Sequence, residues 1–175
     1  STENWERPAD EVEGLMNILQ DVIDQELDEL HQNGVQLRHL GQLEKLSPLL
    51  QEKVKHAVAL TSENSTLVLN IAWNYGGRDE ILHAVKQMIQ DNIDPDNVTE
   101  EVLSSYLYTA GIPDPDLIIR TSGEMRVSNF LIWQGAYAEY YVTDTFWPDF
   151  DKDAFRKALD SYAARNRRFG RVDAS

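Results

Sequence analysis

Cysteine is absent from this sequence, which excludes a disulfide framework and any thiolate chemistry. There is no run of about 18 apolar residues, so no segment is predicted to span a membrane. Neither the glycine fingerprint of dinucleotide sites nor a Walker A motif is present. From these absences we expect a cytoplasmic protein without a nucleotide-binding motif.

Positive charge is scarce as well. Lysine and arginine number 16 against 30 aspartate and glutamate residues, which gives a net charge of −14. A nucleic-acid-binding protein needs a basic face, so we expect no nucleic-acid partner. The few cations gather at two places, Arg120 with Arg126 and a group close to the end of the chain. Such clusters predict either an anion-binding site or ion pairs with the many carboxylates.

The 175 residues, 42% of them hydrophobic, predict one folded domain over residues 1–175. Helical periodicity predicts helices from Pro8 to Asn33, after Ser47-Pro48, over Ile81–Ile89, after Thr99, over Phe130–Ala138 and after Asp151. Strands are predicted over Val35–Leu40, Thr66–Trp73, Leu117–Arg120 and Glu139–Thr143. The apolar run Thr66–Trp73 is expected to be covered on both faces. This alternation predicts an α/β fold, an open and mostly parallel sheet flanked by helices.

In such sheets, ligands bind beyond the carboxyl ends of the strands. One predicted strand is followed by Asn74–Arg78, where two adjacent glycines would let backbone N–H groups approach an anion closely. An ordinary turn between a strand and a helix is the alternative interpretation of this segment.

The segment Arg120–Asn129 follows another predicted strand and combines two arginines with hydroxyl groups. Gly123 allows a tight turn, which would bring Arg126 and Ser128 close to the start of the helix expected after them. Planar guanidinium groups match phosphate oxygens, and a helix N-terminus would add N–H donors. The pattern predicts a diphosphate pocket, while an arginine–glutamate network through Glu124 is the alternative.

Glu139 comes ten residues after Asn129 and lies between two tyrosines in the sequence, Tyr137 and Tyr140. If this carboxylate faces the predicted pocket, it suits Mg²⁺, which prefers carboxylate, water and phosphate oxygens. A lone glutamate can equally be a solvated surface residue, so both interpretations stay open.

Four blocks in this order resemble the undecaprenyl diphosphate synthase family of cis-prenyltransferases: STENWERPADEVEGLM, LNIAWNYGGRDEI, DPDLIIRTSGEMRVSNFLIWQGAYAEYY and FWPDF. The resemblance runs from Ser1 to about Gly170. It implies the cis-prenyltransferase fold and a reaction that condenses isopentenyl diphosphate repeatedly onto farnesyl diphosphate with Mg²⁺. The product would be a long polyprenyl diphosphate, the precursor of the lipid carrier for cell-wall synthesis.

The resemblance also assigns expected roles to residues. Arg120, Arg126, Val127 and Ser128 would hold isopentenyl diphosphate, and Glu139 would reach the metal. The residues expected around the substrates are Ser1, Thr2, Glu3, Trp5 and Arg7. The first helix and the strand Thr66–Trp73 would wall a hydrophobic tunnel for the growing chain, with Leu67, Leu69, Ile71 and Trp73 on one face. Ordinary core packing is the alternative for these four side chains.

Asn4 occupies the position of the family's proton acceptor. A neutral carboxamide is a poor base, so we expect Asn4 to orient groups or to relay the proton to a diphosphate oxygen. The tail Asn166–Gly170 resembles the family's ending that reaches the partner's site across a dimer. The resemblance therefore implies a homodimer, with Arg168 and Gly170 as the residues that complete the site.

The family places a first strand, a phosphate loop with a Mg²⁺-binding aspartate, a helix and a second strand before the STENW block, at which this sequence begins. We therefore expect the chain to correspond to about the C-terminal two thirds of the family domain and to be catalytically inactive by itself. The alternatives are a non-catalytic partner subunit of related fold and a generic phosphate-binding α/β protein. Peripheral membrane contact, if any, is expected from the tunnel mouth and the lipid product.

Overall fold

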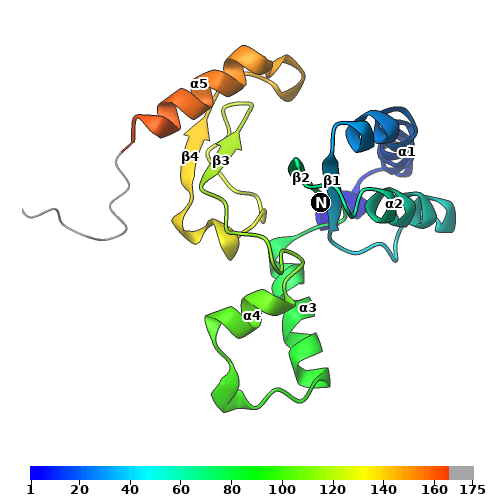
Figure 1. Cartoon of the computed structure of the whole chain (residues 1–175), viewed down its shortest axis with the longest axis vertical. Coiled ribbons are helices and arrows are strands. Elements are labelled where there is room, and N and C mark those ends of the chain that lie inside the picture. The colour runs from blue at the N-terminus through cyan, green and yellow to red at the C-terminus, as the bar shows by residue number, and fades with distance from the viewer. Residues whose placement is uncertain (166–175) are drawn as a thin grey trace, which may run out of the picture. The chain divides into compact units, whose positions relative to one another are not determined.

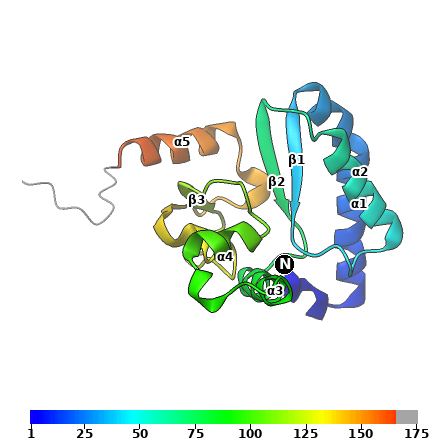
Figure 2. The same ribbon diagram turned by 60° about the horizontal axis from the view of Figure 1, so that its bottom comes forward.

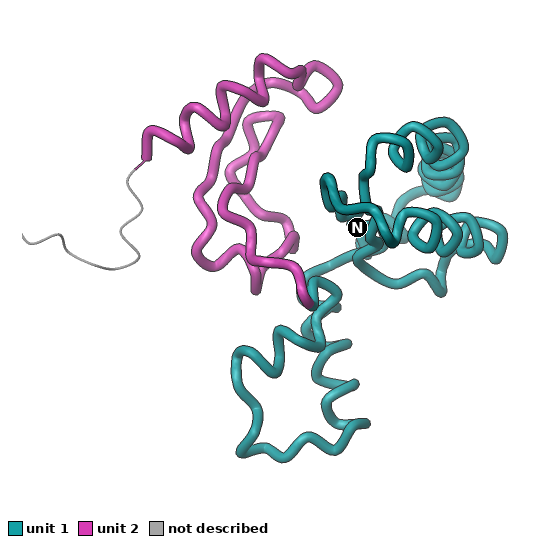
Figure 3. The backbone as a smooth tube through the Cα atoms, in the orientation of Figure 1, with its two compact units in different colours: residues 1–110 teal, residues 111–175 magenta. Residues whose placement is uncertain are grey.

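The computed structural model describes residues 1–165, and the chain divides into two compact units, 1–110 and 111–175 (Figure 3). Each unit has its own pair of parallel strands. No helix within the described 165 residues is long and apolar enough to cross a membrane.

The first unit contains most of the helices. Its elements are the 3₁₀ helix η1 (Thr2–Glu6), α1 (Ala9–Gln32), β1 (Val35–Leu40), α2 (Pro48–Leu60), β2 (Leu67–Ala72), α3 (Gly77–Gln90), the 3₁₀ helix η2 (Pro95–Asn97) and α4 (Glu100–Tyr106) (Figure 1). Helix α1 begins after Pro8, and it ends at Asn33 before Gly34, whose φ is +72°. The hydroxyl of Ser47 accepts a hydrogen bond from the backbone N–H of Leu50 and so caps α2. The expected ends of α1 and the expected start of α2 are confirmed.

Strands β1 and β2 run parallel, in register from Val35 opposite Leu67 to Leu40 opposite Ala72. Helices α1 and α2 lie together on one side of this pair (Figure 2). Between them lies a core cluster of Leu19, Leu46, Leu50 and Val54, and a second cluster joins Val35, Leu37 and Ala57. Each large side chain buried there contributes about 1.5–3 kcal/mol to folding, so this packing fixes the position of β1 and of the carboxyl end of β2.

The prediction that Thr66–Trp73 is covered on both faces is wrong in this structure. Leu67 is 58% exposed, Val68 44% and Leu69 37%. The reason is the position of β2 at the edge of the described pair, because α1 and α2 pack mainly against β1. Only the carboxyl half of β2 is partly buried.

The second unit is built on a shorter strand pair. Its described elements are β3 (Leu117–Arg120), the 3₁₀ helix η3 (Gln134–Tyr137), β4 (Glu139–Val142), the 3₁₀ helix η4 (Trp147–Asp149) and α5 (Lys152–Ala163). Strands β3 and β4 are parallel, with Arg120 opposite Val142. Asp151 caps α5 by accepting a 2.8 Å hydrogen bond from the backbone N–H of Ala154, as its sequence position predicts.

The helix predicted over Phe130–Ala138 is wrong, since only the short η3 forms there. Ser128, Asn129 and Leu131 have φ values of 47°, 62° and 46°. A right-handed helix cannot pass through residues in the left-handed region, so the chain forms tight turns instead. No α-helix therefore starts beside Arg126, and the N–H donors expected from a helix N-terminus are not provided in that way.

Candidate active site

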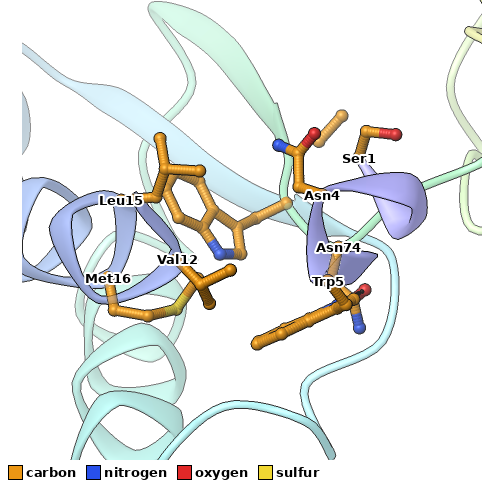
Figure 4. Close-up of a pocket in the computed structure, with 9 residues that line it drawn as sticks. Ser1, Asn4, Trp5, Val12, Leu15, Met16 and Asn74 are labelled. Atoms are coloured by element: carbon orange, nitrogen blue, oxygen red, sulfur yellow. Dashed lines mark hydrogen bonds between the residues drawn. The ribbon is translucent and has the colours of Figure 1, made fainter. Parts of the chain in front are cut away.

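The first unit contains a cavity of about 160 Å³ where η1, α1 and the end of β2 meet (Figure 4). Its lining residues are Ser1, Asn4, Trp5, Val12, Leu15, Met16, Ala72, Trp73 and Asn74. Asn4 of η1 and its N-cap Ser1 supply polar groups at this cavity, while Leu15 and Met16 of α1 supply apolar surface. The structure thus brings together three of the residues predicted around the substrates, Ser1, Asn4 and Trp5.

The other predicted residues of this segment do not line that cavity. The Thr2 and Ser1 hydroxyls both donate to the Glu3 carboxylate. Arg7 forms an ion pair with Glu11 at 3.6 Å, and both side chains are 55% exposed. An exposed pair of this kind contributes little to stability, so Arg7 can exchange its partner at small cost.

Two hydrogen bonds join η1 to the turn that follows β2. The backbone N–H of Thr2 donates to the carbonyl of Tyr75 at 3.0 Å. The Trp5 indole N–H donates to the Asn74 Oδ1 at 2.6 Å. The sequence predicts either an anion-binding turn or an ordinary turn at Asn74–Arg78, and it does not indicate this connection, because Trp5 and Asn74 lie 69 residues apart.

A smaller apolar cavity of about 50 Å³ lies between α1, α2 and the strand pair β1–β2. Trp73 borders both cavities, and Ile71 lines the smaller one. Leu67 and Leu69, predicted to share their face, line neither cavity and are exposed. The candidate tunnel wall therefore consists of the carboxyl half of β2, of β1, and of α1 and α2.

His39 of β1 forms a hydrogen bond with the backbone at Trp73, which borders both cavities. Its Nε2 donates to the carbonyl of Trp73 at 2.9 Å. Burial lowers the pKa of His39, although its hydrogen bond to that carbonyl and the charge of Glu44 act in the opposite direction. A neutral imidazole is favoured at this position, so His39 fixes the chain at Trp73 without adding charge to the cavity wall.

The second unit contains a larger cavity of about 650 Å³ at the carboxyl ends of β3 and β4. Its polar lining comes from Arg120, Thr121, Glu124 and Arg126, and its apolar lining from Ile118, Ile119, Met125, Val127, Phe130, Tyr140 and Val142. Parallel strands present ligand sites at this end. Three predicted residues, Arg120, Arg126 and Val127, are therefore brought together in one cavity.

Arg120 is the last residue of β3, and the strand ladder fixes its backbone through the 2.9 Å hydrogen bond from the Thr143 N–H to its carbonyl. Its Nε is buried and has no hydrogen-bond partner among the residues that the structure describes. Leaving a buried donor of a charged group unpaired costs about 1–3 kcal/mol or more. An anion in the cavity would remove this cost, so the orphaned donor points to an anionic ligand.

Arg126 and Glu124 form an ion pair in the same loop, with side chains 69% and 35% exposed. The predicted alternative, an arginine–glutamate network, therefore holds for Arg126 but does not extend to the Nε of Arg120. Because the pair is exposed, the Arg126 guanidinium can turn from Glu124 to a phosphate at small cost.

Ser128 lies in the same loop but is exposed and does not line the cavity. The loop also contains Ser122 at φ 66°, next to Gly123 at φ 69°. Backbone N–H groups of Ser122 and Gly123 donate to the carbonyls of Thr145 and Thr143 at 2.9 and 2.8 Å. Several residues held in the left-handed region are typical of ligand-binding loops. Of these residues, the sequence indicated a left-handed conformation only at Gly123.

Glu139 lies at the other end of the strand pair, opposite Leu117, and does not line the cavity. Its Oε2 accepts a 2.7 Å bond from Arg165, and both side chains are 32% exposed. Within residues 1–165, no three histidine, cysteine, aspartate or glutamate side chains are grouped so as to hold a metal ion. A single carboxylate already paired with a cation does not fit Mg²⁺, so the described residues do not form a metal site by themselves.

Two predicted site residues, Arg168 and Gly170, lie outside the described residues. Their expected role at a dimer interface stays a prediction.

The chain is similar to known proteins over almost its whole length. Residues 1–170 match the protein family described as "Putative undecaprenyl diphosphate synthase". The chain is 49% identical to an isoprenyl transferase of Clostridium tetani, over 98% of this chain and 69% of that protein. It is 46% identical to a ditrans,polycis-undecaprenyl-diphosphate synthase of Legionella pneumophila, described as specific for (2E,6E)-farnesyl diphosphate, over 100% of this chain and 75% of that protein.

A solved structure is similar over almost the whole chain. The lavandulyl diphosphate synthase of Lavandula x intermedia, in complex with dimethylallyl diphosphate, matches with a TM-score of 0.92 and 34% sequence identity, over 97% of this chain and 75% of that chain. This likeness confirms the α/β fold expected from the sequence. The chain therefore belongs to the undecaprenyl diphosphate synthase family of prenyl transferases.

Proposed function

We propose that this prenyl transferase condenses isopentenyl diphosphate repeatedly onto farnesyl diphosphate and so makes a long polyprenyl diphosphate for cell-wall synthesis. The observation that carries the proposal is the cavity of the second unit, in which the buried Nε of Arg120 has no partner among the described residues. A diphosphate group supplies the acceptors that this donor needs.

The second unit suits isopentenyl diphosphate because polar and apolar surfaces share one cavity. Arg120 and Arg126 would bind phosphate oxygens, and Ser128 would add a hydroxyl from the loop. Val127 and the strand residues Ile118 and Val142 would contact the five-carbon chain. The relative from Legionella named for undecaprenyl diphosphate supports this assignment.

The first unit suits a prenyl chain, since most of its cavity lining is apolar. Asn4 adds an amide to the lining of this cavity, next to Ser1 and Trp5 (Figure 4). Each condensation forms one carbon–carbon bond, breaks the allylic carbon–oxygen bond, and releases diphosphate and a proton. A carboxamide does not accept that proton as a base, so we assign Asn4 to orienting the substrate or relaying the proton to a diphosphate oxygen. Thr2, Glu3 and Arg7 would complete the surroundings.

A role for Mg²⁺ is proposed from the family resemblance, with Glu139 as the residue expected to contact the metal. Because Glu139 is paired with Arg165 in this structure, we assign no step of the reaction to a metal.

A homodimer completed by Arg168 and Gly170 is likewise proposed from the resemblance, and sedimentation of the chain with and without its last ten residues would test it.

Calorimetric titration with isopentenyl diphosphate tests the proposed function. Replacing Arg120 or Arg126 by alanine should weaken binding about 10- to 100-fold, the effect of losing one charge-assisted hydrogen bond of about 1.5–3 kcal/mol. Arg156→Ala, an exposed arginine of α5, is the matched control and should leave the affinity unchanged.

Titration with inorganic diphosphate separates prenyl recognition from general phosphate binding. The proposal requires tighter binding of isopentenyl diphosphate than of diphosphate alone, because Val127 and its apolar neighbours contact only the prenyl group. Equal affinities, or equal effects of Arg120→Ala and Arg156→Ala, would argue for a generic anion site instead.

A further inference from the structure

Asn74 occupies an unusual position directly after β2 and Trp73. The residue is only 4% exposed, although its carboxamide has both a hydrogen-bond acceptor and a hydrogen-bond donor. Its φ is +51°, in the left-handed region that few residues other than glycine adopt. A buried amide in such a conformation is retained only where its surroundings hold it, so its contacts indicate what it does.

The carboxamide of Asn74 connects two separate segments. Its Oδ1 accepts the 2.6 Å hydrogen bond from the Trp5 indole N–H. Its Nδ2 donates to the carbonyl of Gln42 at 2.8 Å, and the Gln42 backbone N–H returns a 3.2 Å bond to the Asn74 carbonyl. An amide is the side-chain group that offers an acceptor and a donor at this length, so an aspartate or an alanine could not make both side-chain contacts.

The segment η1 depends on such contacts for its position. It is a 3₁₀ helix of five residues, and none of these residues is buried. Short 3₁₀ helices have little stability of their own, so η1 is held through Trp5, which is partly buried and packs against the core cluster between α1 and α2. The Thr2–Tyr75 backbone bond and the Trp5–Asn74 side-chain bond both tie η1 to the turn after β2.

We propose that Asn74 is a positioning residue of the first-unit cavity: its carboxamide holds the Trp5 indole against the end of β2 and thereby directs the adjacent Asn4 amide toward the cavity. The placement rests on the geometry alone. Its consequence for ligand binding rests on the proposed function, in which Asn4 and Trp5 contact the prenyl diphosphate.

The substitution Asn74→Gly distinguishes the role of the Asn74 side chain from that of its left-handed backbone. Asn74→Gly keeps the left-handed conformation without strain but removes both side-chain hydrogen bonds. Asn92 is the matched control, because it also has a positive φ, of 55°, yet it is exposed and its side chain donates a 3.2 Å hydrogen bond to the nearby Gln90 carbonyl. Asn92→Gly therefore makes the same backbone change away from the cavity.

The direct test is the ¹⁵N resonance of the Trp5 indole in the 175-residue chain, assigned by its loss in Trp5→Phe. Asn74→Gly should shift this resonance and raise the rate of exchange of the indole proton with solvent by about tenfold or more, whereas Asn92→Gly should change neither. The Trp133 and Trp147 indoles serve as internal references. An unchanged Trp5 resonance in Asn74→Gly would overturn the proposal.

A double-mutant cycle on the dissociation constant of farnesyl diphosphate tests the coupling. Asn74→Gly and Trp5→Phe should each weaken binding about fivefold, and the double variant should be no weaker than the weaker single one, because both remove the same contact. Additive effects would overturn the assignment. If the unsubstituted chain does not bind farnesyl diphosphate, the proposed function fails, and the indole resonance still decides whether Asn74 positions Trp5.

Discussion

Gly41 stands where the backbone leaves no room for a side chain. Its φ is +123°, and a Cβ built on it would lie 2.4 Å from the Trp73 carbonyl oxygen and 2.8 Å from that of Asn74. Gly41→Ala should therefore lower the free energy of unfolding by about 2–3 kcal/mol, because backbone atoms of the turn after β2 must move. Urea denaturation followed by circular dichroism measures this difference.

Gly14 offers the control for that substitution. It lies within α1, is exposed, and a Cβ there would meet nothing within 4 Å. Gly14→Ala should stabilise the protein by about 0.5–1 kcal/mol through helix propensity. Equal unfolding free energies for the two variants would contradict the close approach at Gly41.

Single residues could be predicted from the sequence where local rules apply. Arg120 was identified because it ends an apolar strand, and the structure places it in a cavity at that strand end. The connection from Asn74 to Trp5 could not be predicted, since it joins residues 69 apart and requires the three-dimensional position of η1. The ion pair between Glu139 and Arg165 depends in the same way on the packing of α5 against β4.

At the scale of elements, a buried carboxylate joins α3 to the segment after α4. Glu80 is fully buried, accepts a 2.5 Å hydrogen bond from the Tyr75 hydroxyl and a 2.9 Å bond from the backbone N–H of Tyr108. Glu80→Ala should lower the free energy of unfolding by about 3 kcal/mol, because buried donors lose their acceptor. Thermal and urea unfolding of the variant provide the measurement.

The neutral variant Glu80→Gln should cost less than alanine, since one amide oxygen still accepts a hydrogen bond. Glu52→Ala is the surface control: its side chain is 74% exposed, and its loss should change the unfolding free energy by less than about 0.5 kcal/mol. A Glu80→Ala variant as stable as Glu52→Ala would show that this network does not stabilise the junction between α3 and the segment after α4.

The boundaries of the elements were predictable where capping and strand rules act locally. The strands Val35–Leu40 and Leu117–Arg120 are confirmed, as is the start of α5 at the Asp151 cap. The helix predicted over Phe130–Ala138 failed because Leu131 is forced into the left-handed region, a conformation that its residue type does not indicate. The exposure of β2 was missed because an apolar run shows what a strand can bury and not which neighbours cover it.

For the whole molecule, net charge has a predictable effect. With a charge of −14, like charges repel across the folded chain more strongly than in the expanded unfolded chain. Raising the ionic strength from about 0.01 to 0.15 M shortens the Debye length from about 30 to 8 Å and screens this repulsion. The melting temperature at pH 7 should then rise by about 2–4 °C, the shift that about 1 kcal/mol produces in a domain of this size.

The pH dependence of this salt effect identifies its cause. Near pH 5, close to the isoelectric point of about 4.5, most of the net charge is lost, so added NaCl should barely change the melting temperature. The anion site responds in the opposite sense, because salt weakens the attraction between Arg120, Arg126 and a diphosphate. Salt at pH 7 should therefore stabilise the fold and weaken isopentenyl diphosphate binding in the same protein. A salt effect on melting of equal size at pH 5 and pH 7 would contradict charge repulsion as its origin.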